Sequence, residues 1–538
     1  WHIRMVDNTE CFIVSAAGRL LPFKAEFSER GLCMSSPTQE KLTLMRYIEL
    51  LEEDDLVVSR PSASCDQRIE FATDDSRQVR PGTLFVCKGR AFKREYLLSA
   101  IADGAVAYVS EVDYDVDFPA VIVSDIRRTL AVVADAFYGH PSGRVKVCAF
   151  TGTKGKSTCS FYLRGILANE AKLTGCHRPA LNTGIEFDDG IETGPSKLTT
   201  PESFLLQSRI AHAAEAGAPW LVMEASSQGL KYERTGKIAF EVGAFTNIGE
   251  DHISPIEHPT LEDYFASKLK IFSQSRFAVV NLDMDKVDRV LEAASRCERT
   301  VTFSLTDERA DVLALAIRNG DCGVVATVRT PRFTRDIVIP TPVKFNVSNA
   351  LAAIACAEAL GISEEGIVHG FEGVFVPGRM ELYPSVSGKI LGIVDFAHNG
   401  MSLETLLRDL RENYPERELA VVFGATGGKG VDRRTTMGIA AGKYADRIVI
   451  TEDDPGPENV EDICTEIARN VQAQGNDNWQ IVTDRVAAIE TVVRETVRPA
   501  VVIVTGKGEE ERMLRKNGPE PCERDGSILK RTLAAYDA

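Results

Sequence analysis

The sequence lacks any continuous apolar run that approaches the roughly 20 residues of a membrane-spanning helix. It also lacks an excess of basic residues: Lys and Arg number 62 against 78 Asp and Glu, which gives a net charge of −16. Nucleic acids bind strongly basic surfaces, whereas an acidic chain can still carry one basic pocket for a small phosphorylated ligand. We therefore predict neither membrane insertion nor a nucleic-acid partner.

The twelve cysteines include no Cys-x-x-Cys pair and no regular spacing. Several lie in apolar runs such as VKVCAF and AAIACAEAL, which is typical of buried thiols in a reducing compartment. We therefore expect a cytoplasmic protein without a disulfide framework.

A length of 538 residues and a repeated alternation of apolar strand-like runs with helical stretches predict an α/β fold of about three domains. Residues 1–33 resemble neither a signal peptide nor a clear element, and we predict a leader of unknown role, because capping residues and a helix over about 38–53 follow Met34. The predicted domains are residues 34–143, 144–376 and 377–538. Three runs between residues 300 and 343 have the pattern of antiparallel strands.

The stretch FTGTKGKST at 150–158 joins an apolar strand to a helix. Its spacing differs from the standard phosphate-binding loop, because Phe150 stands where that pattern has glycine. The physical elements remain: Gly152 and Gly155 let backbone N–H groups face an anion, and the helix N-terminus adds partial positive charge. Lys156 can reach the terminal phosphates, and Ser157 can bind Mg²⁺. The alternative is a glycine-rich turn with a solvated lysine.

Polar residues also follow several other apolar strands, at the edge where parallel sheets bind ligands. Glu224 closes WLVME and has the oxygen ligands that Mg²⁺ prefers, although a structural ion pair is the alternative. His252 follows another strand, and a lone histidine is usually structural. Lys268 lies on a predicted amphipathic helix, where a lysine is most often exposed to solvent. The acidic runs TEDDPGPE and TGKGEEE are either solvated faces or a site for a cationic amine.

Together these motifs resemble the Mur ligase family. The matching segments occur in family order between about residues 70 and 515: DDSRQVRPGTLFVCKG, TGTKGKST, LTTPES, MEASSQ, TNIGEDH, YFASKLKIF, FNVSNALAA, VPGRME, VDFAHNG, a GGKG loop and TGKGEEE. Within the family, the chain is most similar to the tripeptide synthetases of the lysine-adding type, which add the third amino acid of the peptidoglycan stem.

The resemblance implies three domains: a domain for the UDP end of the substrate, a central ATP-binding domain with a P-loop and a parallel sheet, and a Rossmann-like domain for the incoming amino acid. It implies a monomeric, ATP-dependent ligase that joins L-lysine to UDP-N-acetylmuramoyl-L-alanyl-D-glutamate through an acyl phosphate. The implied cofactors are ATP, two Mg²⁺ ions and a carbamylated lysine at Lys268.

The resemblance also assigns residues. ATP-binding positions are Gly152, Thr153, Lys154, Gly155, Lys156, Ser157, Thr158, Asn349, Arg379, Asp395 and His398. Positions for the UDP-muramoyl-dipeptide are Ser76, Thr199, Thr200, Ser226 and Arg234. The metal ligands are Ser157, Glu224, His252 and carbamylated Lys268, and the catalytic residues are Lys156, His252 and Lys268. Amino-acid-binding positions are Arg434, Asp453, Asp454, Gly506 and Glu510.

One departure from the family bears on selectivity. Diaminopimelate-adding relatives carry Asp-Asn-Pro-Arg, whose arginine binds the distal carboxylate, whereas residues 453–456 here are Asp-Asp-Pro-Gly. The lost guanidinium and the added acid favour a side chain that ends in an ammonium. Lysine and the shorter ornithine both remain candidates, because one methylene is worth only about 1–3 kcal/mol.

Two other functions share parts of this pattern. A folylpolyglutamate synthase has the same acyl-phosphate chemistry but would not be expected to carry the DDSR segment of a UDP-binding domain. A non-catalytic protein that keeps the fold would have no need for intact Lys156, Glu224, His252 and Lys268.

Overall fold

The computed structural model describes residues 3–5, 11–14, 20–23, 41–62, 64–89, 92–249, 257–320, 323–428 and 430–538. The chain forms two compact units, Trp1–Thr38 and Gln39–Ala538. In the first, strands β1 (Ile3–Met5), β2 (Cys11–Val14) and β3 (Leu20–Phe23) make an antiparallel sheet. The sequence pattern of residues 1–33 predicts no clear element, so these three strands were not expected.

The second unit begins with a five-stranded sheet of order β4-β8-β7-β6-β5, parallel except at β4. The helix predicted over 38–53 begins later, at Leu44, because the Thr43 hydroxyl caps it by accepting a hydrogen bond from the Arg46 N–H. The elements are α1 (Leu44–Glu53), β4 (Val57–Ser59), β5 (Phe71–Thr73), η1 (Ser76–Gln78), β6 (Thr83–Val86), α2 (Arg94–Ala102), β7 (Ala105–Ser110), β8 (Ala120–Val123), α3 (Ile126–Phe137) and η2 (Pro141–Gly143).

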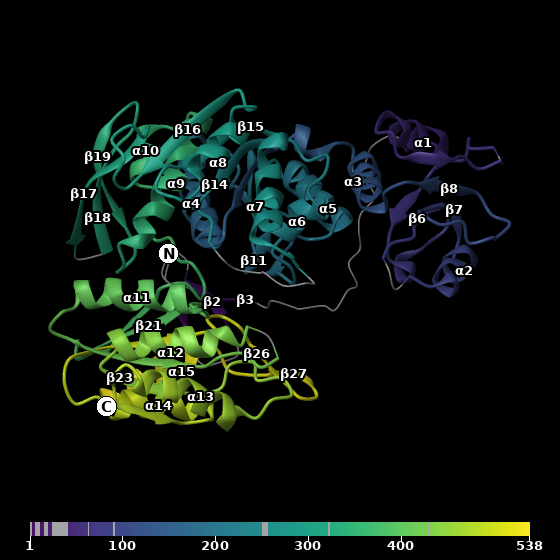
Figure 1. The fold of residues 1–538 in the computed structure, drawn as a ribbon. Helices are drawn as coiled ribbons and strands as arrows, with labels where there is room; N and C mark the ends of the chain where they lie inside the picture. The colour runs from purple at the N-terminus through teal and green to yellow at the C-terminus, as the bar shows by residue number, and fades with distance from the viewer. Residues whose placement is uncertain are drawn as a thin grey trace. The chain divides into compact units, whose positions relative to one another are not determined.

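An eleven-stranded sheet follows, in the order β12-β11-β10-β13-β9-β14-β15-β16-β17-β18-β19. Its strands are β9 (Lys146–Thr151), β10 (Ala180–Asn182), β11 (Glu186–Asp188), β12 (Thr193–Pro195), β13 (Trp220–Glu224), β14 (Phe240–Phe245), β15 (Ser275–Asn281), β16 (Arg299–Ser304), β17 (Val312–Gly320), β18 (Gly323–Arg329) and β19 (Thr334–Ile339). The seven strands from β10 to β17 pair in parallel, and β17–β19 pair antiparallel as predicted for residues 300–343 (Figure 1).

Helices cover both faces of this sheet, because successive strand residues point to opposite sides. Cys148 and Phe150 of β9 face α4 and α9, whereas Val147 and Ala149 face α5 and α7. The helices are α4 (Lys156–Thr174), α5 (Ser203–Glu215), α6 (Ser227–Lys231), α7 (Leu261–Leu269), η3 (Lys270–Gln274), α8 (Val287–Ala294), α9 (Phe345–Leu360) and α10 (Glu364–Val368).

The C-terminal segment contains a six-stranded sheet of order β20-β21-β25-β22-β23-β24, parallel except at β20. A two-stranded hairpin, β26–β27, follows it. The elements are β20 (Glu381–Pro384), β21 (Ile390–Asp395), α11 (Gly400–Asn413), β22 (Glu418–Phe423), α12 (Asp432–Tyr444), β23 (Arg447–Ile450), α13 (Val460–Gln472), β24 (Trp479–Ile481), α14 (Arg485–Arg494), β25 (Ala500–Thr505), β26 (Arg512–Arg515), β27 (Gly518–Pro521) and α15 (Asp525–Tyr536).

The α/β fold class is confirmed, with one sheet of five or more strands in each of the three predicted domains. The domain boundaries themselves stay a prediction. Within the described ranges, every helix is too short or too polar to cross a membrane. The described cysteines are free thiols and most are buried, but Cys176 is exposed.

Candidate active site

A cavity of about 660 Å³ in the second unit brings the glycine-rich loop together with residues from the C-terminal sheet. Its lining contains most of the predicted nucleotide and metal positions. These are Thr153, Lys154, Gly155, Lys156, Ser157, Thr158, Glu224, Asn349, Arg379, Asp395 and His398, together with Thr199 and Glu510. Residues separated by more than 350 positions in the sequence therefore line the same cavity.

The loop between β9 and α4 depends on two glycines in the left-handed region. Gly152 has φ +150°, and a Cβ there would lie 2.0 Å from the Thr246 hydroxyl. Gly155 has φ +84° and sits at the N-terminus of α4, where a Cβ would lie 2.2 Å from the Asn349 side-chain oxygen. Both positions therefore combine an unfavourable backbone for L-residues with close contact, which only glycine accommodates.

Two lysines bind the same carbonyl of this loop. The Lys156 ammonium donates to the Gly152 carbonyl at 3.0 Å and to that of Thr153 at 3.2 Å. The Lys268 ammonium, which is 1% exposed, donates to the Gly152 carbonyl at 2.8 Å and lies over the Tyr264 ring. Lys268 is therefore part of the loop's supporting structure, although it does not line the cavity.

The predicted metal ligands Ser157 and Glu224 are in direct contact. The Ser157 hydroxyl donates to Glu224 Oε1 at 2.7 Å, and the Gly184 N–H donates to the same oxygen at 2.8 Å. Glu224 is 2% exposed and ends strand β13. One hydroxyl and one buried carboxylate at the cavity wall fit the oxygen preference of Mg²⁺. His252, the third predicted ligand, lies outside the described residues.

Asp395 and Arg379 form the opposite part of the lining. Asp395 ends β21 and accepts hydrogen bonds from the backbone N–H groups of Met380 (3.1 Å) and Ala397 (2.9 Å). Burial raises the pKa of Asp395, and the Arg379 guanidinium and these N–H groups oppose that shift. Arg379 lies 4.2 Å from the centre of the Phe396 ring.

His398 extends the same aromatic arrangement. Its Nδ1 lies 2.7 Å from the Phe396 carbonyl, and its ring packs edge-on against the Phe396 ring at 4.7 Å. Arg379 and His398 thus both pack against the Phe396 ring at the cavity wall, and this group could contact a planar heterocycle.

The positions predicted for the muramoyl-dipeptide lie around the start of α6. The Thr200 hydroxyl donates to the Glu224 carbonyl (3.0 Å) and accepts from the Ser226 N–H (2.9 Å). The Arg234 guanidinium donates to the Thr200 carbonyl at 3.2 Å and pairs with Glu202 at 2.8 Å. Thr200, Ser226 and Arg234 are therefore connected to the metal-ligand position through the backbone of Glu224.

A chain of charges leads from this group to the first sheet of the unit. Glu202 also pairs with Lys88, and Lys88 pairs with Asp74 at 3.1 Å. Asp74 lies two residues before Ser76, which is half-buried in η1. Lys88 and Glu202 were not predicted as site residues, although both stand inside segments that carried the family resemblance.

Basic side chains of the same protein form ion pairs with the acidic run at 452–454. The Lys507 ammonium, 2% exposed, binds Asp454 Oδ1 at 2.8 Å and also pairs with Glu510. Burial alone would lower the pKa of Lys507, but its hydrogen bonds to these two carboxylates outweigh burial and raise it. Burial raises the pKa of Asp453 to about 6. The Asp453 carboxylate faces Gly506, where a Cβ would meet it.

Arg434 does not reach this acidic pair. Its guanidinium binds Glu458 at 2.6 Å and Glu466 at 2.9 Å and is 7% exposed. The loop that begins at Thr426 connects the two places, because the Gly427 N–H donates to the Asp454 carbonyl at 3.0 Å. A role for Arg434 in binding the amino acid stays a prediction.

Asn247 and Glu509 are two site residues that the sequence motifs did not predict. The Asn247 side-chain oxygen accepts the Lys154 N–H at 2.8 Å, and Glu509 lies 3.6 Å from Arg379. Both line the cavity. Position at a strand end could have identified Asn247, which closely follows β14.

Comparison with known proteins decides the family. The model for the Mur ligase middle domain matches residues 150–357, and that for the Mur ligase glutamate ligase domain matches residues 378–508. A protein of Streptococcus thermophilus named UDP-N-acetylmuramoyl-L-alanyl-D-glutamate–L-lysine ligase is 38% identical over 437 residues, covering 81% of this chain and 86% of its own length. The chain belongs to the Mur ligase family.

Solved structures agree with the fold of this Mur ligase. A UDP-N-acetylmuramoyl-L-alanyl-D-glutamate–2,6-diaminopimelate ligase superimposes with a TM-score of 0.66 at 24% identity, over 93% of this chain and all of that one. The MurF ligase of Thermotoga maritima, solved with ADP, gives a TM-score of 0.57 at 18% identity over 87% and 97%. These similarities show the three-domain architecture of the family.

Proposed function

We propose that this Mur ligase is an ATP-dependent ligase that adds L-lysine to UDP-N-acetylmuramoyl-L-alanyl-D-glutamate, in the synthesis of peptidoglycan precursors. The observation that supports this most is the cavity that joins the Ser157–Glu224 pair to the Arg379–Asp395 wall. The 38% identity to a lysine-adding ligase supports the choice of amino acid.

The reaction begins with activation of a carboxylate, because a free carboxylate has no usable leaving group. An oxygen of the D-glutamyl γ-carboxylate attacks the γ-phosphorus of ATP, the bond to the bridging oxygen breaks, and ADP leaves. The lysine amine then attacks the acyl carbon, phosphate departs with the bonding electrons, and the amine nitrogen loses a proton. Both partners of the first step are anions, so stabilisation of negative charge is the main requirement.

Lys156 supplies positive charge to the transferred phosphoryl group in this proposal. Its ammonium donates to the loop carbonyls of Gly152 and Thr153, and phosphate oxygens can replace these acceptors. Residues 152–158 would hold the phosphates at the N-terminus of α4. Asn349, Arg379, Asp395 and His398 would hold the rest of the nucleotide from the facing wall.

Two Mg²⁺ ions would supply positive charge that offsets the negative charge of the phosphates and the carboxylate. Ser157 and Glu224 would hold one ion, and His252 with a carbamylated Lys268 the other. Burial of Lys268 against the loop supports its selection for a modification that converts an amine into an oxygen ligand.

Substrate contacts follow from the same proposal. Thr199, Thr200, Ser226 and Arg234 would bind the dipeptide, and Ser76 the uridine end. For the amino acid, we propose that Asp453, Asp454, Gly506 and Glu510 surround the lysine, with Arg434 at its α-carboxylate. Because Lys507 occupies Asp454 and Glu510, we expect lysine binding to redistribute these charge pairs.

L-ornithine is the second candidate substrate. Its ammonium would suit the same acidic residues and it is one methylene shorter. Folylpolyglutamate synthase activity is a third candidate function. The DDSR segment and the 38% identity to the streptococcal ligase both argue against it. We further propose that the protein acts as a monomer in the cytoplasm on small-molecule substrates alone.

A phosphate-release assay with UDP-N-acetylmuramoyl-L-alanyl-D-glutamate tests the proposal. L-lysine, L-ornithine, meso-diaminopimelate and L-glutamate are supplied separately, and the ligated product is identified by mass spectrometry. We expect phosphate and a lysyl product with lysine only. Ligation of diaminopimelate or L-glutamate instead of lysine would overturn the assignment.

A further inference from the structure

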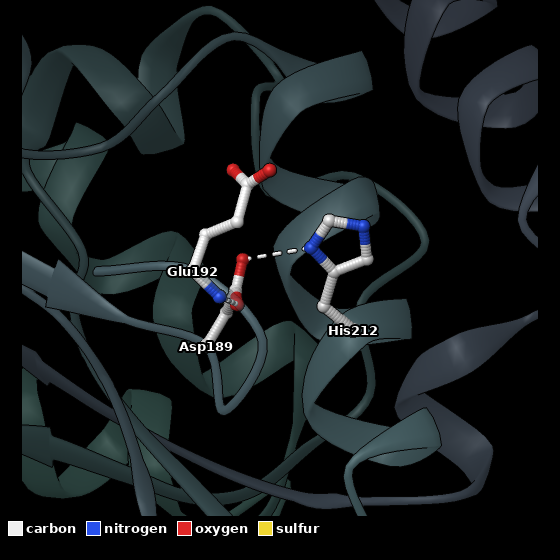
Figure 2. Close-up of side chains that lie close together, drawn as sticks. All are labelled: Asp189, Glu192 and His212. Atoms are coloured by element: carbon white, nitrogen blue, oxygen red, sulfur yellow. Dashed lines mark hydrogen bonds and ion pairs between the residues drawn. The ribbon is translucent and has the colours of Figure 1, made fainter. Parts of the chain in front are cut away.

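A histidine and two carboxylates meet on the opposite side of β13 from the loop strand β9, at the hairpin of β11 and β12. The turn Asp189–Glu192 joins these two strands, and His212 lies in the last turn of α5. One ligand atom from each of Asp189, Glu192 and His212 lies within 4.8 Å of the others. Figure 2 shows the Asp189 carboxylate facing the His212 ring, with Glu192 rising from the same turn.

Two of these three groups are already held in place. Asp189 is 1% exposed, and its Oδ1 accepts the N–H groups of Ile191 (3.0 Å) and Glu192 (2.7 Å). Its other oxygen, Oδ2, therefore faces His212 Nδ1 at 2.9 Å. In a tetrahedral site with ligands about 2.0–2.2 Å from the ion, neighbouring ligand atoms are roughly 3.3 Å apart. A small increase in the distance between Asp189 Oδ2 and His212 Nδ1 would therefore let both atoms bind one ion.

The charges around the trio favour a cation. The adjacent Asp188 is neutralised by Arg164 and Arg178, at 2.6 and 2.8 Å. By contrast, across the part of the chain that the structure describes, Asp189 has only His212 as an ion-pair partner and Glu192 has none. The two carboxylates together carry a charge of about −2, which exceeds the +1 of Arg209, whose guanidinium interacts with both of them.

We propose that Asp189, Glu192 and His212 bind one divalent transition-metal cation of the Zn²⁺ type. One imidazole nitrogen with two carboxylate oxygens suits Zn²⁺ or Co²⁺, whereas Mg²⁺ prefers oxygen ligands alone. The trio shares no residue with the lining of the nucleotide cavity. A bound ion would fasten the β11–β12 turn to α5, the helix that begins at Ser203, three residues after Thr200.

Calorimetric titration with Zn²⁺ tests this proposal on the full chain without nucleotide, after chelator treatment and in excess Mg²⁺. Four proteins are compared: wild type, Glu192→Gln, His212→Gln and Glu215→Gln. Glu215 is an exposed acid on the same turn of α5 and serves as the matched control, because its loss changes the local charge and leaves the ligand set intact. Absorption of the Co²⁺-loaded proteins reports the ligand geometry.

We expect one Zn²⁺ to bind to the wild type and to Glu215→Gln with similar affinity. Binding should weaken at least about tenfold in Glu192→Gln and more in His212→Gln, with loss of the visible Co²⁺ bands. Glu192 is exposed, so its substitution tests the site even if His212→Gln unfolds. Equal Zn²⁺ affinity in wild type and Glu192→Gln, or no binding to the wild type, would overturn the proposal and leave a simple Asp–His hydrogen bond.

Discussion

Lys268 is a buried cation that donates a hydrogen bond to a carbonyl of the phosphate-binding loop. On the residue scale, Lys268→Ala removes that support as well as the proposed metal ligand. We expect the rate of phosphate release to fall about 100-fold or more, since loss of several kcal/mol of transition-state stabilisation has that effect. Added bicarbonate should not restore activity, because alanine offers no amine to modify.

Lys270→Ala is the matched control for that variant. Lys270 lies two residues further on, is largely exposed and pairs with Glu233 at the surface. Its removal should leave the rate within about twofold, because an exposed ion pair contributes little. Near-normal turnover by Lys268→Ala would contradict the role proposed for that residue.

Asp453 makes stability depend on pH. Its pKa is raised to about 6 by burial, so between pH 4 and 6 the folded state holds a proton that the unfolded state has released. Stability therefore falls as the pH rises through this window and levels off above it. The loss between pH 5 and pH 7 is about 1 kcal/mol.

Asp453→Asn should remove this dependence, because the amide cannot ionise. Urea unfolding at pH 5 and pH 7 measures the change, and the decline with pH should be smaller in the variant than in the wild type. Asp446→Asn is a suitable control, since that half-buried carboxylate is paired with Arg411. An identical pH dependence in wild type and Asp453→Asn would show that Asp453 does not titrate in this range.

On the element scale, helix α4 has a glycine in the left-handed conformation at each end, but the two meet different neighbours. A Cβ on Gly155 would collide with Asn349 of α9, whereas a Cβ on Gly175 would meet nothing within 4 Å. Gly155→Ala should therefore raise the KM for ATP and lower kcat, because the loop and α9 must separate. Gly175→Ala should cost only about 1 kcal/mol of stability.

Steady-state kinetics and thermal unfolding of the two variants distinguish these effects. Both substitutions carry a similar backbone cost, so a difference in KM isolates the contact with Asn349. Equal kinetics for Gly155→Ala and Gly175→Ala would mean that the close approach to α9 does not shape the nucleotide site.

The elements that the sequence predicts well are those with a strong local signal. Continuous apolar runs predict β9, β13, β14 and β21. Glu224 and Asp395, which close β13 and β21, line the cavity as expected, whereas His252, expected after β14, lies outside the described residues. Strands β10–β12 were missed, because three-residue segments with polar residues give no periodicity. The pairing of Lys507 with Asp454 was also beyond prediction, since it joins residues 53 positions apart through the fold.

On the scale of the whole molecule, the nucleotide cavity joins the glycine-rich loop of the eleven-stranded sheet to the end of β21 in the six-stranded sheet. A non-hydrolysable ATP analogue should therefore slow amide hydrogen exchange in both places at once, over residues 153–158 and 395–401. The antiparallel strands β18 and β19 contribute nothing to the lining and should exchange unchanged.

Hydrogen-exchange mass spectrometry with and without the analogue measures this protection. Arg379→Ala provides the control, because it removes one contact of the C-terminal wall and should reduce protection at 395–401 more than at 153–158. Protection confined to 153–158 in the wild type would contradict a shared cavity.

The division of the cavity between two distant stretches of chain also affects the protein during its own synthesis. A ribosome that has released residues only up to about 370 has produced the phosphate loop, Glu224 and Lys268, but neither Arg379 nor Asp395. Such a nascent chain contains only part of the nucleotide site, so we expect it not to hydrolyse ATP before the C-terminal residues are synthesised. Competence for catalysis then arrives late in translation, when the last third of the polypeptide has emerged.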